Sequence, residues 1–502
     1  MEDEDGSDSS EIRVEDWEYL PNSPNDDAKR KSWKKIIVVA LIITALILSV
    51  ILGSFPLQQI STTPSSPSRL HVATGDGFVF LSWTLVYISG QAPVTSYNVF
   101  RGIDNHNLTF FFSMDYEYQN QFSDHFVETE TTYRYQVSAI NRFGEGPRSP
   151  IANVTYHSLG EPTGWNRSVI DDSTLFGEYN SIAVDSNDEV HISYYDSFWQ
   201  PGGGLKYATN KGGNWTTTRV PTYPSSGGRI GLHTSIATDS KDNLHISYFD
   251  FDSCTLRYAT NVGGNWSNYT IDRNYFVGTY SSIGIDSKDC IHISYYDTTQ
   301  ADLKYATNSY GNWTNATIDS NGEVGASTSL AIDSLDRIHI AYYDRTNQAV
   351  KYTIGDGDIW SYTFIDTVGG EYETIDSSSI SLDVDSSSFV HIAYYDWTDI
   401  CLKYATNAGG AWHSTVVRNL MGVGVGLSIA LDSNDKVHVS YQDDQSYYLL
   451  YSTNADGGWQ TLLMNGKGYD PLSGEYSSIA IDSKDKVHIA YYDEGLRYIT
   501  NS

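Results

Sequence analysis

Short runs of alternating apolar and polar residues recur at a nearly constant interval from residue 161 to the C-terminus. Each unit carries the phrase S-I-A-V-D-S-x-D-x-V-H-I-S-Y-Y-D or a variant of it, followed by L-K-Y-A-T-N or its equivalent. In six units a G-x-x-W turn or a close variant comes next. The alternation has a period of two residues, so each unit of about 48 residues predicts four short strands. The histidine of the phrase recurs at spacings of 47 to 54 residues: His191, His245, His292, His339, His391, His438 and His488.

The number of units and the place of the last strand predict how the units assemble. Four-stranded units of this length are typical of β-propeller blades. The seventh unit ends at Ser502 without its Trp strand, and a matching strand, Gly164–Ile170, precedes the first unit. Pairing of that early strand with the last unit would close the ring and remove an open sheet edge. We therefore expect residues 161–502 to form a seven-bladed β-propeller.

The repeat motifs resemble those of two groups of proteins. The turns Asn210–Trp215, Asn261–Trp266 and Asn407–Trp412 resemble the Asp-box of bacterial neuraminidase-type repeats, with Asn in the Asp position. The longer phrase is similar to prokaryotic propeller repeats of the SLALDS…HISYYD…LKYA type over all of 161–502, a resemblance that implies no activity. The Asp-box resemblance implies a sialidase-like glycoside hydrolase, which needs three arginines and a Tyr–Glu pair. The chain has no Arg-Ile-Pro signature and no recurring Glu near a lone Tyr, so we assign no catalytic residue and expect no enzyme.

Residues 67–157 show roughly seven shorter alternating runs broken by turn residues, which predicts a β-sandwich. Trp83, Tyr97 and the run Tyr133-x-Tyr135-x-Val137 resemble a fibronectin type III domain over nearly its full length. The resemblance implies that Trp83 is the core tryptophan and that Tyr133 forms the tyrosine corner. No Arg-Gly-Asp occurs, and a fold alone does not specify function, so we expect this domain to be a spacer.

An uncharged run of twenty residues, Ile36–Phe55, has the length of a membrane-spanning helix. Five basic residues lie between positions 29 and 35, and the next basic residue is Arg69. The positive-inside rule therefore predicts a single-pass signal anchor, with the N-terminus in the cytoplasm and an all-β ectodomain outside the cell. A cleaved signal peptide fits less well because the apolar run is too long. We expect the acidic tail 1–35 to be disordered and the Ser/Thr/Pro-rich segment 56–66 to be a stalk.

The composition restricts the classes of partner. A formal net charge of −31 argues against nucleic-acid binding, because phosphate contacts need clustered Lys and Arg. Three cysteines, Cys254, Cys290 and Cys401, provide no disulfide framework and no zinc spacing, and we expect free, buried thiols and no cofactor. Asn-x-Ser/Thr sequons in the outer part are candidate glycosylation sites: Asn107, Asn153, Asn166, Asn214, Asn265, Asn268, Asn312 and Asn315.

The polar residues of the repeat favour architecture over chemistry. Each histidine is expected to pair with an acid of the preceding D-S-x-D turn (Asp185 or Asp188 for His191) rather than with a metal, because neighbouring sheets lie ~10 Å apart. The residue two positions after each histidine alternates between Ser and Ala, which predicts a small slot against an aromatic residue of the next blade. Turn hydrogen bonds or a cation-attracting rim would explain the acids that end these strands: Asp196, Asp250, Asp297, Asp344, Asp396, Asp443 and Asp493.

Departures from the repeat indicate where a ligand would bind. Trp199 and Trp397 follow the second strand of units one and five, outside the repeated Trp position, and Arg229, Arg273 and Arg418 lie in connections expected on the same face. Exposed tryptophans stack on sugars or anchor protein contacts, and incidental loop packing is the competing explanation. We expect a membrane-anchored extracellular binding or adhesion protein for a glycan or protein ligand. A sialidase-like glycoside hydrolase and a purely structural component of the cell envelope are the alternatives.

Overall fold

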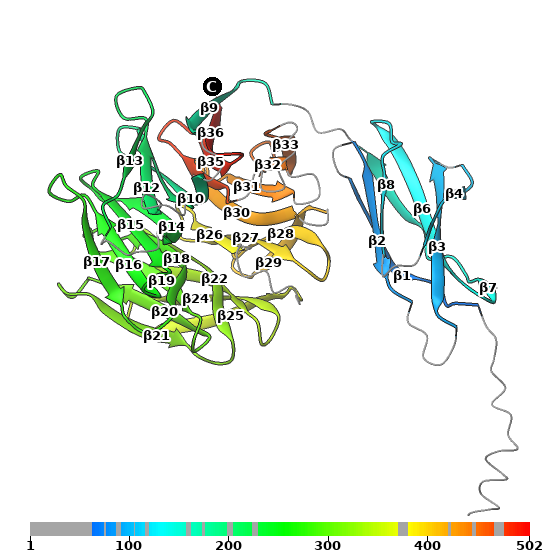
Figure 1. Cartoon of the computed structure of the whole chain (residues 1–502), viewed down its shortest axis with the longest axis horizontal. Coiled ribbons are helices and arrows are strands. Elements are labelled where there is room, and N and C mark those ends of the chain that lie inside the picture. The colour runs from blue at the N-terminus through cyan, green and yellow to red at the C-terminus, as the bar shows by residue number, and fades with distance from the viewer. Residues whose placement is uncertain are drawn as a thin grey trace, which may run out of the picture.

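The computed structural model describes residues 63–501 apart from 75–76, 87–91, 105, 116–119, 157–161, 173–175, 198–203, 223–228, 370–379, 420–422, 444–447 and 466–475. The regular elements of the described residues are all strands (Figure 1). No helix among them is long and apolar enough to cross a membrane. The expected tail, the anchor at 36–55 and most of the stalk lie outside the described residues, so the anchor stays a prediction.

The N-terminal domain is a two-sheet β-sandwich. One sheet has the order β1 (Ser68–Thr74), β2 (Val79–Thr84) and β5 (Gln121–Asp124). The other has the order β4 (Thr109–Asp115), β3 (Val94–Ile103), β6 (Thr131–Asn141) and β7 (Gly144–Glu145), and β8 (Ala152–Tyr156) also pairs with β6. The inward residues of both sheets form its core, in which Trp83, Tyr97 and Tyr133 are fully buried. The Tyr133 hydroxyl accepts a hydrogen bond from the Glu128 backbone N–H at 2.8 Å, so its polar end is satisfied within the domain.

Seven four-stranded antiparallel sheets follow among the described residues, and each forms one blade whose first strand lies nearest the axis. Blades 1 to 4 are β10–β13 (Phe176–Val184, Val190–Asp196, Gly204–Thr209, Thr216–Arg219), β14–β17 (Ile230–Thr238, Leu244–Asp250, Thr255–Thr260, Ser267–Asp272), β18–β21 (Val277–Ile285, Ile291–Asp297, Asp302–Thr307, Thr314–Asp319) and β22–β25 (Val324–Ile332, Ile338–Asp344, Ala349–Gly355, Trp360–Thr367). Blades 5 to 7 are β26–β29 (Ile380–Val384, Val390–Asp396, Cys401–Thr406, His413–Arg418), β30–β33 (Val423–Leu431, Val437–Asp443, Tyr448–Thr453, Gln460–Leu463) and β34–β36 with β9 (Ser478–Ile481, Val487–Tyr492, Leu496–Asn501, Trp165–Asp171).

The blades form a closed ring. The innermost strand of each blade lies against that of the next, and β34 of blade 7 lies against β10 of blade 1. Strand β9 pairs antiparallel with β36, with Trp165 opposite Asn501, so an N-terminal strand completes the last blade (Figure 1). The β-propeller expected from the repeats is confirmed.

One serine on the innermost strand of each blade links that blade to the next. Its Oγ accepts a hydrogen bond of 3.0 to 3.2 Å from a backbone N–H of the following blade, and the bond from Ile182 to Ser478 joins blade 1 to blade 7. A buried N–H without a partner costs ~1–3 kcal/mol, so each serine removes a penalty at a blade junction. We call these residues the serine ring: Ser181, Ser235, Ser282, Ser329, Ser381, Ser428 and Ser478.

The D-S-x-D turns make a second series of links between blades. The second acid of a turn accepts hydrogen bonds from the serine of the preceding blade, as Asp242 does from the backbone N–H and the hydroxyl of Ser186. Equivalent bonds to the serine N–H join six junctions, including the one between Ser483 and Asp188 that closes the ring. At the junction of blades 4 and 5, Ser388 stands in the position of the acid. The turns therefore hold neighbouring blades together.

Each repeated histidine lies in a buried polar chain, as expected. His191 Nε2 is 3.2 Å from Asp185 Oδ2, and its Nδ1 is 2.6 Å from the Tyr207 hydroxyl. The Tyr207 ring then packs edge-on against Trp266 of blade 2, with ring centroids 5.6 Å apart. The same Asp–His–Tyr–Trp series recurs at every junction, so the partner of each histidine is the first acid of its turn.

The Ser/Ala alternation after each histidine has a different cause from the one expected. Each serine faces a hydroxyl of the next blade, with Oγ atoms 2.8 to 3.0 Å apart in Ser193–Thr234, Ser247–Ser281, Ser294–Thr328 and Ser440–Ser477. Ala341 instead shares an apolar cluster with Ile380, and Ala393 shares one with Leu427. At these six junctions the residue follows the polarity of its neighbour in the next blade, so the expectation that only size matters, against an aromatic neighbour, is wrong. Ala490 is the exception, because blade 1 has Asn180 at the corresponding position.

The sandwich packs against blades 5 and 6. Ala73, Phe78 and Phe80 of the sandwich belong to one apolar cluster with Tyr395 and Trp397 of blade 5. The Arg418 guanidinium donates a hydrogen bond of 2.9 Å to the Thr74 carbonyl oxygen. We call this contact the domain interface. The two domains therefore share an apolar contact and a hydrogen bond, and the spacer role stays a prediction.

Candidate functional site

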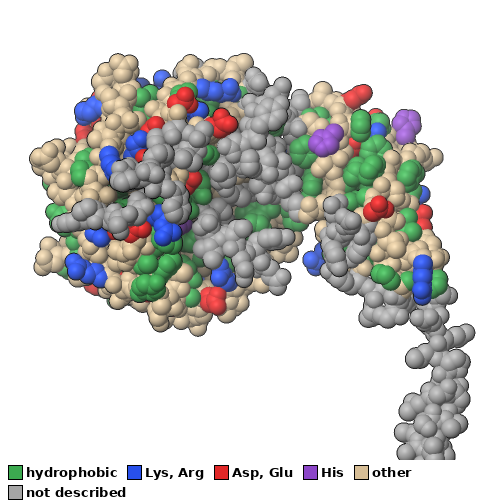
Figure 2. Space-filling model, viewed as in Figure 1, with side chains coloured by type: hydrophobic (Ala, Val, Ile, Leu, Met, Phe, Trp, Pro, Cys, Tyr) green, Lys and Arg blue, Asp and Glu red, His purple; other side chains and the backbone are tan. Residues whose placement is uncertain are grey.

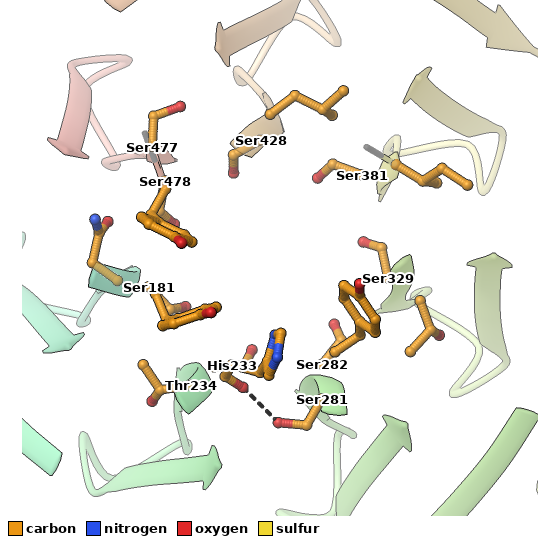
Figure 3. Close-up of a pocket in the computed structure, with 18 residues that line it drawn as sticks. Ser181, His233, Thr234, Ser281, Ser282, Ser329, Ser381, Ser428, Ser477 and Ser478 are labelled. Atoms are coloured by element: carbon orange, nitrogen blue, oxygen red, sulfur yellow. Dashed lines mark hydrogen bonds between the residues drawn. The ribbon is translucent and has the colours of Figure 1, made fainter. Parts of the chain in front are cut away.

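A cavity of about 150 Å³ lies on the propeller axis (Figure 3). Its walls come from the innermost strands and their first turns in all seven blades, and the serine ring surrounds it. Most of the other lining residues carry hydroxyls, among them Thr234, Ser281, Thr328 and Ser477. Among its described lining residues, Ile380 and Leu427 are the only aliphatic ones, and both lie on the side of blades 5 and 6.

Four aromatic rings from four consecutive blades line one side of this cavity. Tyr476, Tyr179, His233 and Tyr280 follow one another, with successive ring centroids 4.5, 4.6 and 4.8 Å apart and interplanar angles of 45 to 56°. We call them the aromatic arc. Each occupies the position two residues before a serine of the ring. The same position holds Ser327 in blade 4 and Gly426 in blade 6, so the arc covers only part of the circumference.

The backbone of the arc adopts a conformation that non-glycine residues rarely take. The φ angles of Tyr179, His233, Tyr280 and Tyr476 are between 49° and 54°, in the left-handed region, and Ser327 and Gly426 share this conformation at the same position of blades 4 and 6. The cause is a bulge in the innermost strand, which shifts the register between Glu178 and Ser181 and at the equivalent places of other blades. Hydrogen bonds support the bulge, as when the Ser281 hydroxyl donates to the His233 carbonyl oxygen at 2.9 Å. Strained residues held by their surroundings are frequent at functional sites.

The cavity carries little charge. None of its described lining residues is Asp, Glu, Lys or Arg. Burial lowers the pKa of His233 to about 3, so its imidazole is neutral at physiological pH. Elsewhere on the propeller, Lys/Arg and Asp/Glu side chains are scattered over the visible face (Figure 2). The axial site therefore offers rings and hydroxyls without ionic groups.

Two of the three predicted arginines lie in the connections on either side of blade 2, Arg229 before β14 and Arg273 after β17, and neither lines the cavity. The Arg229 guanidinium stacks over Phe251 at 3.8 Å and lies 3.8 Å from Asp252. Arg273 is exposed in the connection that follows β17. Arg418 lies in blade 5, where it contacts the sandwich. The structure therefore does not bring the three arginines together around one carboxylate-sized site.

The structure describes only one of the two tryptophans predicted to lie on the ligand face. Trp199 lies outside the described residues, so its place on a ligand face stays a prediction. Trp397 is partly buried in the domain interface, where its ring packs edge-on against Tyr395 with centroids 4.4 Å apart. It therefore has a packing role inside the chain, which the repeat pattern alone did not reveal.

The acids that end the second strand of each blade act in turns. Six of them are buried, all except Asp493. Asp297 Oδ1 accepts backbone hydrogen bonds from Thr299 and Gln300, and Asp396 Oδ1 accepts them from Thr398 and Asp399. Their other oxygens face cations of the third strand, as in the 2.5 Å contact of Lys403 with Asp396. Turn chemistry accounts for them, and they do not form an exposed cation-attracting rim.

The sequons and cysteines differ in accessibility. Seven of the eight sequon asparagines are exposed and Asn268 is partly buried, but the side-chain amides of Asn268 and Asn315 donate to the carbonyl oxygens of Pro221 and Ile271 in the preceding blade. A glycan would use that same nitrogen, so these two positions are the poorest candidates. All three cysteines are free. Cys401 is buried, but Cys254 and Cys290 are partly exposed, against the expectation for those two.

The aromatic arc was not among the predicted site residues. A sequence signal for it exists, because an aromatic residue stands two positions before the ring serine in four of seven units. The sequence prediction instead placed the ligand at Trp199 and Trp397, which follow the Y-Y-D ending of the second strand and depart from the repeat. The left-handed turn that points these rings at the axis has no signature in an alternating pattern.

The chain is similar to several solved structures at low sequence identity. The chain is similar to a protein of unknown function from Dyadobacter fermentans (11% identity, 68% of this chain and 99% of that one, TM-score 0.42). It is similar to the Aleuria aurantia lectin, described as a six-bladed β-propeller with a fucose recognition mode (12% identity, 60% and 100%, TM-score 0.40). It is also similar to polysaccharide lyase Uly1 (10% identity, 64% and 88%, TM-score 0.41). No protein-family model and no curated protein matches the sequence.

Proposed function

We propose that this chain is an extracellular binding protein whose propeller takes its ligand at the axial cavity. The observation that carries the proposal is the aromatic arc, whose four residues all depart from the preferred backbone conformation and present their rings to one cavity. Rigid aromatic side chains give large contact areas at low entropic cost. Such strain persists only where the surrounding structure enforces it, and binding sites are places where it occurs.

The proposal includes the anchor and the domain types. We propose that residues 36–55 hold the protein in a membrane with the N-terminus in the cytoplasm, and that the sandwich is a fibronectin type III domain. The basic residues on only one side of the apolar run support the orientation. The strand order of the two sheets and the satisfied hydroxyl of Tyr133 support the domain type. Protease added to intact cells should remove the ectodomain and spare an N-terminal tag, and loss of the tag would reverse the orientation.

The binding site is tested on the full-length chain against arrays of glycans and extracellular proteins. Tyr179→Asn removes one ring of the arc, and asparagine tolerates a positive φ better than most residues, so the fold should persist. Tyr269→Asn on the outer strand β17, half exposed, is the matched control. We expect the first variant to lose binding and the control to keep it. Equal binding by both variants would move the ligand site away from the axis.

The two alternatives are outcomes of the same experiment. A sialidase-like hydrolase would need acids and arginines around the substrate, and the described lining residues of the cavity include neither. Release of sugar from an array glycan on incubation with the chain would favour that alternative. A purely structural envelope component would bind no array ligand at all.

A further inference from the structure

We propose that the axial cavity takes one uncharged sugar ring, stacked on the aromatic arc with its oxygens toward the serine ring. This inference rests on the proposed function, because it presumes that the axial cavity is the ligand site. It names the class of ligand, a neutral saccharide, and it excludes acidic saccharides and quaternary ammonium groups. Size, hydrogen-bonding polarity and charge each support it.

The size of the cavity fits a single ring. A cavity of about 150 Å³ is smaller than the ~300–1,000 Å³ of drug-sized ligand sites. It equals the ~150 Å³ of an engineered protein cavity that accommodates benzene, a six-membered ring. The ligand would therefore insert one terminal ring, and the remainder of a longer glycan would extend away from the axis.

The serine ring determines the polarity that the cavity presents. Each of its seven Oγ atoms already accepts a backbone N–H from the next blade. Among the described residues no acceptor is found for the hydroxyl protons of these serines. These serines line the cavity (Figure 3), so their hydroxyl protons are available to a ligand there. A ligand rich in acceptor oxygens satisfies these donors, whereas a quaternary ammonium group has no acceptor to offer them.

The aromatic arc supplies the apolar half of the site. The C–H face of a sugar ring packs on an aromatic ring, and the hydroxyls on the ring edge remain available to hydrogen-bond. In this cavity the rings lie on the side of blades 7, 1, 2 and 3, and the serine ring runs around the whole axis. The arrangement therefore offers a stacking surface and donors to the same small ligand.

The charge distribution excludes acidic sugars. No described lining residue could form an ion pair with a carboxylate or a sulfate, and the imidazole of His233 is neutral. The formal net charge of −31 makes the whole molecule repel anions. A carboxylate would have to lose its hydration in the cavity without an ionic partner, which is unfavourable. Sialic and uronic acids are thus poor ligands for this site.

The experiment titrates the full-length chain, in a detergent without a sugar headgroup, with single-ring probes by saturation-transfer NMR and calorimetry. The probes are methyl glycosides of neutral hexoses and deoxyhexoses, free N-acetylneuraminic acid, methyl glucuronide and tetramethylammonium chloride. We expect at least one neutral glycoside to bind, the other three probes not to bind, and Tyr179→Asn to weaken the binding by tenfold or more. Tyr269→Asn should leave the affinity unchanged.

Each other outcome overturns the inference in a recognisable way. Binding of an acid or of tetramethylammonium that Tyr179→Asn abolishes would refute the ligand class and leave the proposed axial site intact. Neutral glycosides that bind both variants equally would place the saccharide elsewhere and refute the axial site as well. If no probe binds although Tyr179→Asn still abolishes array binding, the ligand is not a single sugar ring and the proposed function survives.

Discussion

The backbone N–H of Ile182 donates a hydrogen bond of 3.2 Å to the Oγ of Ser478, which lies 296 residues further along the chain. Strand β10 begins the first blade and β34 begins the last, so this bond joins the two ends of the ring at its centre. The D-S-x-D turns make a second link between the same blades, from the Ser483 backbone N–H to Asp188 at 3.0 Å. Within blade 7, β9 pairs with β36 and completes the sheet. The closing junction therefore has the same serine and turn bonds as five of the six internal ones.

Ser478→Ala tests the central link of this junction. We expect it to lower the free energy of unfolding of the propeller by ~1–3 kcal/mol, because the Ile182 N–H loses its partner in a region with limited access to water. Urea denaturation measures the change. Ser361→Ala on the exposed face of β25 is the control, and equal midpoints for the two variants would show that the serine ring adds nothing to closure.

A larger closure test removes residues 161–171, which contain strand β9. We expect the shortened chain to unfold at a lower temperature and to aggregate, because the edge of β36 loses its partner strand. Thermal unfolding followed by light scattering provides the measurement. An unchanged unfolding temperature would contradict the role assigned to β9.

The hydroxyl pairs between blades can be tested by a double-mutant cycle. Ser294→Ala should destabilise the propeller by ~1–3 kcal/mol, because it leaves the buried Thr328 hydroxyl without the Ser294 oxygen at 2.9 Å. The double change Ser294→Ala with Thr328→Val should recover part of that loss, since the junction of Ala341 and Ile380 is already apolar. Strict additivity of the two single changes would argue that the hydroxyls do not interact.

The repeated histidines predict how stability depends on pH. Burial lowers the pKa of His339 and of the other six, although the neighbouring acid raises it in part. Below the unfolded value of about 6.5 the unfolded chain therefore binds more protons, so stability is full above that pH and is lost as the pH falls. Asp383 acts in the opposite sense, because burial raises its pKa to about 6, but it is one group against seven.

The measurement is the unfolding free energy in urea between pH 7.5 and 5. We expect this free energy to decrease as the pH falls. His339→Gln removes one titrating group, so it should reduce the slope of the free energy against pH by at most ~1.4 kcal/mol per pH unit, the contribution of one proton. His413→Gln changes an exposed histidine of β29 and should leave the slope as it is. A wild-type stability that does not vary over this range would contradict the neutral state assigned to the buried histidines.

The domain interface predicts that the sandwich and the propeller stabilise each other. Trp397→Ala removes a large side chain from the shared apolar cluster, and we expect the sandwich to unfold a few degrees earlier in scanning calorimetry. Ile359→Ala, at a position 77% exposed in blade 4, is the control. If Trp397→Ala leaves the sandwich transition unchanged, the interface does not contribute to its stability. Reduced glycan binding by the same variant in an intact fold would return Trp397 to the ligand face.

Much of the propeller could be predicted because its determinants are local. Period-two alternation predicts the strands, and the interval between the histidines predicts the length of a blade. The Trp strand before the first unit predicts closure of the ring. The acid that partners each histidine lies six residues earlier in the same hairpin, so it was also predictable. The prediction for the Ser/Ala positions was wrong because each serine bonds to a residue of the next blade, about 40 residues away. The pattern of a single strand does not indicate which residue of the next blade it faces.

The sequence by itself determined the strands, the repeat and the charge, since each depends on residues close together in the chain or on composition alone. Only the tertiary structure decided that Tyr476, Tyr179, His233 and Tyr280 meet at one cavity, because ring closure brings positions about 50 to 300 residues apart onto a common axis. It also decided that Trp397 and Arg418 face the sandwich, because packing between domains depends on surfaces that neither domain's repeat pattern describes. Contacts between distant segments depend on the closure of the ring and on the apolar surface that the two domains bury together. Both are properties of the whole fold.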